Sequence, residues 1–180
     1  MLILASSSPT RAKILSGFGI EFVQRSVDFD EDAVTASSPI EFVYIATSGK
    51  MRAAKTAFGA SIPLLCADTV VSVGGEILRK AIDRADAERL LRKQSRAKVE
   101  IITCTMYAKS GLEYIDTSVT SYLFDRFDES ALTVYLDSDE WQGKAGAIMV
   151  EGFAKPYIID VVGYESCAMG LTVEKLLPFL

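Results

Sequence analysis

A carboxylate inside an apolar segment is the feature of this sequence that most clearly points to chemistry. Asp68 stands within residues 64–73, which are otherwise almost continuously apolar. Burying an unpaired carboxylate is costly, so Asp68 needs a cation, a metal ion or a strand-end position that meets solvent. Carboxylates at strand ends serve both as ligands of Mg²⁺ and as general bases. The alternative is a structural aspartate whose charge is held by backbone N–H groups.

A second candidate site lies where the first apolar stretch ends in small polar residues. Ser8 suits the N-cap of a helix, and Pro9 suits its first position. The free N–H groups at a helix start favour an anion, and the Ser6 hydroxyl and Arg11 guanidinium add donors that fit phosphate oxygens. The alternative is an ordinary capped helix with a surface arginine. The chain has no Walker A sequence.

Three lysines and one glutamate extend the set of charged candidates. Lys80 follows a Gly-Gly hairpin signal soon after Asp68, so we expect it to fold back near the carboxylate. Lys144 stands among small residues that let a backbone approach a ligand. For Lys50, Lys80, Lys144 and Glu31 alike, the alternative is a solvated surface residue. Cations for phosphates and carboxylates for Mg²⁺ together favour phosphoryl chemistry over acyl transfer or redox chemistry.

Composition excludes several other classes of function. The chain contains no histidine, which removes Ser-His-Asp and Cys-His catalysis and His-ligated zinc. Cys66, Cys104 and Cys167 are widely spaced, so we expect buried, reduced thiols in a cytoplasmic protein. The net charge of −5 argues against a nucleic-acid or membrane partner. Neither a leader pattern nor an apolar run of membrane length is expected.

The elements that must position these residues follow from apolar periodicity and turn signals. The length of 180 residues predicts one domain, residues 1–180, and we expect a mixed α/β fold whose sheet has parallel and antiparallel parts. Phe18 is expected on the inward stripe of the first helix. The predicted strands are residues 1–5, 20–27, 64–73, 76–78, 98–108, 112–127, 148–150 and 157–162. The predicted helices are one that begins at Pro9, carries Phe18 and is ended by Gly17 and Gly19, residues 39–58, residues 83–94, a segment capped by Asp128, and residues 171–180.

Four segments, in this order and at matching spacing, resemble the Maf family of nucleoside triphosphate pyrophosphatases. They are residues 4–11 (LASSSPTR), 67–71 (ADTVV), 75–80 (GEILRK) and 144–147 (KAGA). The resemblance implies a Maf/ITPase-like fold, an elongated mixed β-sheet flanked by helices with two lobes around a cleft. It also implies cleavage of the α–β phosphate bond of a nucleoside triphosphate, with Mg²⁺ or Mn²⁺ as cofactor, and it allows a homodimer. Such an enzyme removes surplus or modified nucleotides.

The resemblance also implies roles for particular residues. Asp68 corresponds to the general base, and from their charge we infer that Asp68 and Glu31 face the metal. Lys80 favours dTTP or UTP, or a modified pyrimidine nucleotide, as substrate. The positions expected to bind substrate are Ser6, Thr10, Arg11, Lys50, Lys80, Lys144 and Glu151.

Some positions depart from the family pattern. Thr10 stands where the family has arginine or tryptophan, Glu151 where it has glutamine, and Ala81 and Thr172 where it has proline. A hydroxyl cannot replace the paired donors of an arginine. The segment 95–98 also lacks the family's histidine. These departures keep a second hypothesis open, namely a weakly catalytic homologue that binds nucleotides or takes part in cell division.

Overall fold

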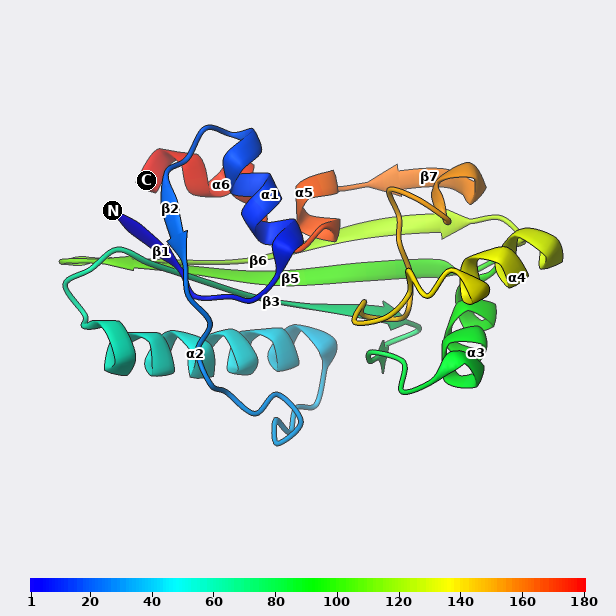
Figure 1. Cartoon of the computed structure of the whole chain (residues 1–180), viewed down its shortest axis with the longest axis horizontal. Helices are drawn as coiled ribbons and strands as arrows, with labels where there is room; N and C mark the ends of the chain where they lie inside the picture. Colours follow the sequence, from blue (N-terminus) through cyan, green and yellow to red (C-terminus); the bar gives the residue numbers. More distant parts are fainter. The chain divides into compact units, whose positions relative to one another are not determined.

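The protein is a mixed α/β structure, as expected, in a computed structural model that describes residues 1–180 (Figure 1). Its seven-stranded sheet has the order β2-β1-β3-β5-β6-β7, with β4 paired to β3. β1 pairs with β2 and β3 in parallel, whereas β4 and β7 pair with β3 and β6 in antiparallel fashion. The strands are β1 (Leu2–Leu4), β2 (Phe22–Gln24), β3 (Leu64–Val73), β4 (Glu76–Leu78), β5 (Lys98–Lys109), β6 (Leu112–Phe124) and β7 (Ile158–Val162). The helices are α1 (Pro9–Gly17), α2 (Pro39–Phe58), α3 (Arg84–Gln94), α4 (Glu129–Asp137), α5 (Glu165–Ala168) and α6 (Val173–Leu176), with 3₁₀ turns η1 (Lys155–Tyr157) and η2 (Leu177–Phe179).

The chain divides into two compact units. The first unit comprises residues 1–69, 102–118 and 164–180, and the second comprises residues 70–101 and 119–163. Strands β3, β5 and β6 contribute residues to both units. A single domain over residues 1–180 stays a prediction. None of the helices has the length and apolar character needed to cross a membrane.

The core of the first unit forms because α1 and α6 cover one face of its strands and α2 lies on the other (Figure 1). Leu15 of α1 and Leu176 of α6 pack with Leu4, Leu65 and Tyr107 from the strands. On the opposite face, α2 is joined to the sheet through a hydrogen bond from its Thr47 to a β5 carbonyl. Asp68 therefore lies on a strand that is covered on both sides.

Helix α2 begins as its sequence predicts and continues through a glycine in its middle. The Ser38 hydroxyl accepts a hydrogen bond from the Glu41 backbone N–H at 3.2 Å, and Pro39 occupies the first turn. Gly49 does not interrupt the helix. A Cβ at Gly49 would overlap the ring of Phe29, so this glycine lets the loop before α2 pack closely against the helix.

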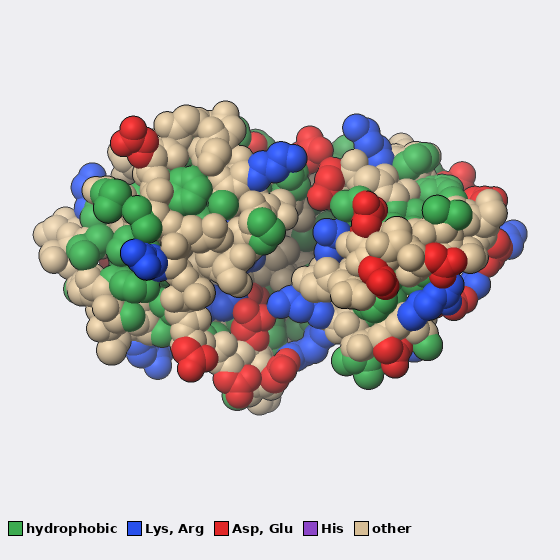
Figure 2. Space-filling view, viewed as in Figure 1, with side chains coloured by type: hydrophobic (Ala, Val, Ile, Leu, Met, Phe, Trp, Pro, Cys, Tyr) green, Lys and Arg blue, Asp and Glu red, His purple; other side chains and the backbone are tan.

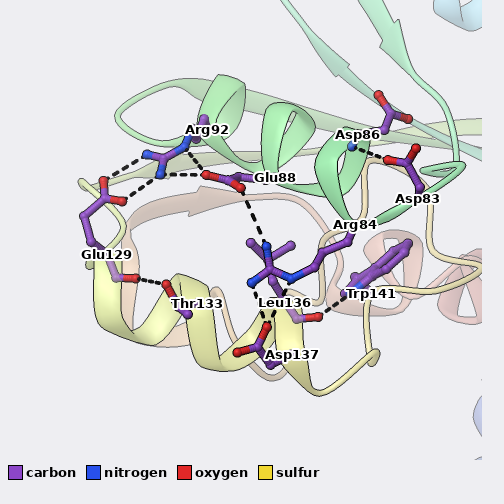
Figure 3. A network of polar contacts seen from close by, with 10 residues as sticks. All are labelled: Asp83, Arg84, Asp86, Glu88, Arg92, Glu129, Thr133, Leu136, Asp137 and Trp141. Atoms are coloured by element: carbon purple, nitrogen blue, oxygen red, sulfur yellow. Dashed lines mark hydrogen bonds and ion pairs between the residues drawn. The ribbon is translucent and has the colours of Figure 1, made fainter.

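Helices α3 and α4 of the second unit are joined by a network of charged side chains (Figure 3). Arg84 contacts Asp137 at 2.6 Å, and Arg92 contacts Glu129 at 2.8 Å. Glu88 contacts both arginines, which links the two pairs. Exposed pairs of this kind each contribute little, about 0–1 kcal/mol, so the network mainly fixes how the two helices align.

Several predicted elements were wrong in position or extent. Residues 148–150 form no strand, because backbone hydrogen bonds from Ala147 to Lys144 and from Ile148 to Ala145 close turns there instead. The second strand is shorter than predicted because its partner β1 has only three residues. The predicted final helix is split into α6 and η2, where Pro178 removes a backbone donor. Phe18 is 47% exposed because the helix has already ended at Gly17.

Candidate functional site

Asp68 is buried in the middle of β3, and its charge is held by a lysine. Only 5% of its side chain is exposed, and its Oδ1 accepts a hydrogen bond from the Lys50 ammonium at 2.5 Å. The alternative of an aspartate held by backbone N–H groups is therefore wrong. The second oxygen, Oδ2, is buried with no hydrogen-bond partner. A buried oxygen without a partner is costly, so it is a natural acceptor for a ligand or a proton.

Lys50 reaches two carboxylates from α2. Its Nζ lies 2.5 Å from Glu31 and 2.5 Å from Asp68. Because its side chain is only 12% exposed, the expectation that Lys50 could be an ordinary surface lysine is wrong. Glu31 comes from the acidic loop between β2 and α2, over which acidic side chains gather in Figure 2. This loop is not simply solvated, since one of its carboxylates enters the cluster.

The electrostatics of the cluster raise the pKa of Asp68. Burial is the largest cause, because it penalises the charged carboxylate, and Glu31 acts in the same direction. Lys50 and Arg11 oppose the shift by stabilising the charge. The net result is a carboxylate with a pKa above its ordinary value, which makes it a stronger base than an exposed aspartate.

Arg11 projects from α1 and is held by three oxygens. Its Nε donates to the Gly170 carbonyl at 2.7 Å, Nη1 donates to the Ser6 hydroxyl at 3.1 Å, and Nη2 donates to the Thr69 hydroxyl at 3.1 Å. Burial lowers the pKa of Arg11, whereas Asp68 and Glu31 raise it. An arginine stays protonated in this situation, so the guanidinium remains a fixed positive charge.

The Ser6–Ser8 turn is also held in place by a residue that sequence reasoning did not single out. Gln24 of β2 donates to the Ser6 carbonyl at 2.8 Å and to the Ser8 carbonyl at 3.1 Å. The Ser8 hydroxyl accepts from the Arg11 N–H as the predicted N-cap. Nothing in the sequence marks Gln24, because its role depends on the parallel pairing of β2 with β1.

The remaining predicted site residues are divided between the two units. Thr10 is half-buried in the first turn of α1 in the first unit. Lys80, Lys144 and Glu151 belong to the second unit, where Lys80 is exposed and forms an antiparallel bridge with Ala145, next to Lys144. The structure thus brings Ser6, Arg11, Glu31, Lys50 and Asp68 together in the first unit, and Lys80 and Lys144 together in the second.

A polar pocket of about 460 Å³ in the second unit adjoins both lysine segments in sequence. It is lined by residues 81–84, which follow Lys80, and by Asp139 and residues 141–143, which precede Lys144. Gly146 lies at the end of the second segment with φ +61°, and a Cβ there would lie 3.0 Å from Val71. Only glycine fits this position without strain, so the KAGA segment has a structural reason for its glycine.

The carboxylates in the first unit are compatible with a divalent cation. No group of three or more carboxylate, thiol or imidazole side chains forms a preformed cage. Mg²⁺, however, usually binds through one or two carboxylates together with water and substrate phosphates. Asp68 and Glu31 supply such a pair, and the unpartnered Oδ2 of Asp68 is a hard oxygen donor.

Comparison with known proteins agrees with the sequence resemblance. The family model described as Maf-like protein matches residues 1–180. The chain is 53% identical to a nucleoside triphosphate pyrophosphatase from Nitratiruptor sp. over 98% of this chain and 96% of the relative. It is 40% identical to one from Helicobacter pylori strain Shi470 over 99% and 94%, and 37% identical to one from Campylobacter jejuni over the full length of both. Among solved structures, the Staphylococcus aureus Ham1 protein is similar at a TM-score of 0.49 and 16% identity, over 68% of this chain and 71% of that one.

Proposed function

Because the chain belongs to the Maf family, we propose that it is a nucleoside triphosphate pyrophosphatase that hydrolyses the α–β phosphate bond and releases a nucleoside monophosphate and pyrophosphate. The curated relatives carry that activity as their name. The single observation that carries the proposal is Asp68, a buried carboxylate with one oxygen on Lys50 and the other without a partner. An acceptor of this kind suits the removal of a proton from an attacking water.

In the first unit, the role that we propose for each residue follows from the charge of its side chain. Asp68 accepts the proton of the attacking water, and its raised pKa makes it a stronger base than an ordinary aspartate. Lys50 holds Asp68 in place through Oδ1. Arg11 presents a fixed positive charge to phosphate oxygens, on which negative charge builds during cleavage of the anhydride.

The proposal includes a divalent cation, Mg²⁺ or Mn²⁺. Asp68 and Glu31 are the residues that would hold it. When bound, such an ion neutralises charge on the phosphates and makes the leaving pyrophosphate more stable. Lys50 keeps both carboxylates close together when no ion is present.

The other residues that we expect to bind substrate include Lys80, Lys144 and Glu151 of the second unit. Lys80 and Lys144 supply cations for the triphosphate, and the residue type at Lys80 favours dTTP or UTP, or a modified pyrimidine nucleotide. Thr10 and Glu151 stand where the family binds substrate, and the carboxylate of Glu151 either repels phosphate or selects a base that offers an N–H edge. A cytoplasmic location, a homodimer and the absence of a nucleic-acid partner stay predictions.

The decisive experiment measures pyrophosphate release from a panel of nucleotides with Mg²⁺ or Mn²⁺. Asp68→Asn keeps the size of the side chain but removes the base, and we expect kcat to fall about 10²–10⁴-fold. Asp116→Asn is the matched control, because Asp116 also lies on a strand and pairs with a lysine, Lys175, at 2.9 Å. The control is expected to keep the activity of the unaltered protein.

The pH profile gives a second readout of the same role. Since only the ionised carboxylate accepts a proton, kcat/KM should rise with pH through the raised pKa of Asp68. Equal activity of Asp68→Asn and the unaltered protein would overturn the role of Asp68. Nucleotide binding without turnover across the whole panel would instead favour the second hypothesis, a weakly catalytic nucleotide-binding or cell-division protein, and release of orthophosphate would identify a different hydrolase.

A further inference from the structure

Two threonines, the half-buried Thr69 and the fully buried Thr103, form a hydroxyl chain next to Arg11. Arg11 Nη2 donates to the Thr69 hydroxyl at 3.1 Å, and the Thr69 and Thr103 hydroxyl oxygens lie 2.8 Å apart. Thr103 then donates to the Cys167 carbonyl at 2.8 Å. All of these residues belong to the first unit, and Thr103 is fully buried on β5.

The direction of every proton in this chain follows from its two ends. The Cys167 carbonyl has no proton, so the single hydroxyl proton of Thr103 must point at it. Thr103 therefore accepts from Thr69 rather than donating to it. The Thr69 proton is used in that bond, which leaves its oxygen to accept from Arg11. Hydrogen bonds aligned in this way polarise one another and hold their members in one orientation.

The same contacts determine which donors of Arg11 remain for a ligand. A guanidinium has five N–H groups, one on Nε and two on each terminal nitrogen. Gly170, Ser6 and Thr69 take one each from Nε, Nη1 and Nη2. One N–H is left on each terminal nitrogen. A guanidinium that keeps an N–H on each terminal nitrogen can bind two oxygens of one phosphate.

The segment at residues 167–170 closes the other side of Arg11. Gly170 has φ +107°, and a Cβ there would lie 3.3 Å from Arg11 Nε and 3.4 Å from the Thr69 hydroxyl. The Gly170 N–H also donates to the Cys167 carbonyl, the same oxygen that ends the hydroxyl chain. Arg11 is thus bound at Nε by the Gly170 carbonyl. Its Nη2 is bound by the hydroxyl chain, which ends at the carbonyl of Cys167, three residues before Gly170.

We propose that Thr103 is a positioning residue, which through Thr69 fixes the guanidinium of Arg11 so that its two remaining N–H groups meet a phosphate of the substrate. The proposal rests on the proposed function for the identity of the ligand. Thr103 touches no substrate itself. Without its hydroxyl, the Thr69 proton loses its acceptor, the hydroxyl is free to rotate, and Nη2 of Arg11 loses a fixed partner.

Thr103→Val tests the proposal, since valine keeps the shape of the side chain and removes the hydroxyl. We expect kcat/KM for nucleotide hydrolysis to fall about tenfold, the effect of losing one well-formed hydrogen bond. Thr103→Ser retains the hydroxyl and is expected to restore most of this loss. Thr105→Val is the matched control, because Thr105 is also fully buried on β5, two residues along, but its hydroxyl has no partner.

Two further measurements separate positioning from a general structural effect. In an Arg11→Lys background, Thr103→Val should change kcat/KM by less than about twofold, because the group it positions is already absent. The ¹⁵N-NMR signal of the Arg11 Nε–H should exchange with solvent faster in Thr103→Val than in Thr105→Val, with no substrate present.

The outcomes are distinct from those that test the enzyme itself. A protein that releases no pyrophosphate from any nucleotide loses the proposed function, whereas the exchange measurement still tests the positioning of Arg11. An equal fall in kcat/KM for Thr103→Val and Thr105→Val, an undiminished effect in the Arg11→Lys background, or unchanged exchange of the Arg11 Nε–H would each overturn the role of Thr103.

Discussion

Removing the ammonium of Lys50 is the most informative perturbation of the cluster. Lys50→Met keeps the length and apolar stem of the side chain but leaves Asp68 and Glu31 without their shared cation. Leaving Asp68 without a cation costs more free energy than leaving Glu31 without one, since only 5% of the Asp68 side chain is exposed, whereas 38% of the Glu31 side chain is exposed. Leaving one member of a buried pair alone typically costs about 3–5 kcal/mol. We expect the lower end, about 3 kcal/mol at about pH 8, because Arg11 still attracts Asp68.

The pH dependence of this loss has a definite sign. Burial and Glu31 already raise the pKa of Asp68. Removing Lys50, whose attraction opposes them most strongly, should raise this pKa further. A carboxyl whose pKa is higher in the folded than in the unfolded protein disfavours folding above that pKa and stops doing so as it becomes protonated. The deficit of Lys50→Met should therefore shrink as the pH falls through the raised pKa of Asp68.

Urea unfolding, followed by fluorescence of Trp141, measures both effects. The double variant Lys50→Met, Asp68→Asn is the control, because it removes the uncompensated charge as well as the cation. It should recover at least half of the lost free energy of unfolding. A loss below about 1 kcal/mol, a loss that does not change with pH, or no recovery in the double variant would refute the assignment of a buried Asp68–Lys50 pair.

Two further substitutions test the local structure of the second unit. Gly146→Ala should lower the free energy of unfolding by about 3 kcal/mol, because a Cβ there adds backbone strain in the left-handed region and a close contact with Val71. Gly19→Ala is the control, since Gly19 also has a positive φ, +69°, but open space around it, and it should lose only about 1 kcal/mol. Equal losses for the two variants in urea unfolding would contradict this reasoning. Asp128→Ala should lower it by about 1 kcal/mol, because the carboxylate caps α4 by accepting from two of its backbone N–H groups; an unchanged urea midpoint would show that the cap contributes nothing.

The sequence predicts elements well where local signals agree with each other. β3 begins and ends at the predicted residues because an apolar run is closed by two glycines that form the turn to β4. The starts of α1, α2 and α4 were also predicted, since their capping residues act within a single turn. These features depend on neighbours in the chain, which are visible in the sequence.

Errors arise where burial comes from something other than regular structure. Ile148 and Val150 are buried, as the prediction of a strand requires, but they lie in turns fixed by the left-handed Gly146 and Ala147. The apolar pattern alone cannot distinguish a buried turn from a short strand. The hydroxyl of Tyr135 bonds the Ala147 carbonyl and helps to hold this segment in place, a contact between residues twelve positions apart.

The partners within the site could not be predicted, because they are set by packing. Asp68 was recognisable as a group that needs a cation, but the sequence favoured Lys80, which is close along the chain. The structure instead supplies Lys50 from α2, which packs across the strand that carries Asp68. Thr103 did carry a signal, a hydroxyl in an apolar strand, but a threonine in a strand is common and its partner at Cys167 lies 64 residues away.

The charges of the cluster also bear on how it would meet a triphosphate. Arg11 and Lys50 carry two positive charges, and Glu31 and Asp68 carry two negative ones, so the cluster is close to neutral when Asp68 is ionised. A neutral cluster attracts a polyanion weakly, and Lys50 is already committed to the carboxylates. Arg11 has two N–H groups beyond those that its three protein partners accept from, and we propose that these bind phosphate in the first unit. A divalent cation on the carboxylates would supply further positive charge for a triphosphate, so the near-zero net charge of the cluster and a need for an added cation belong to one arrangement.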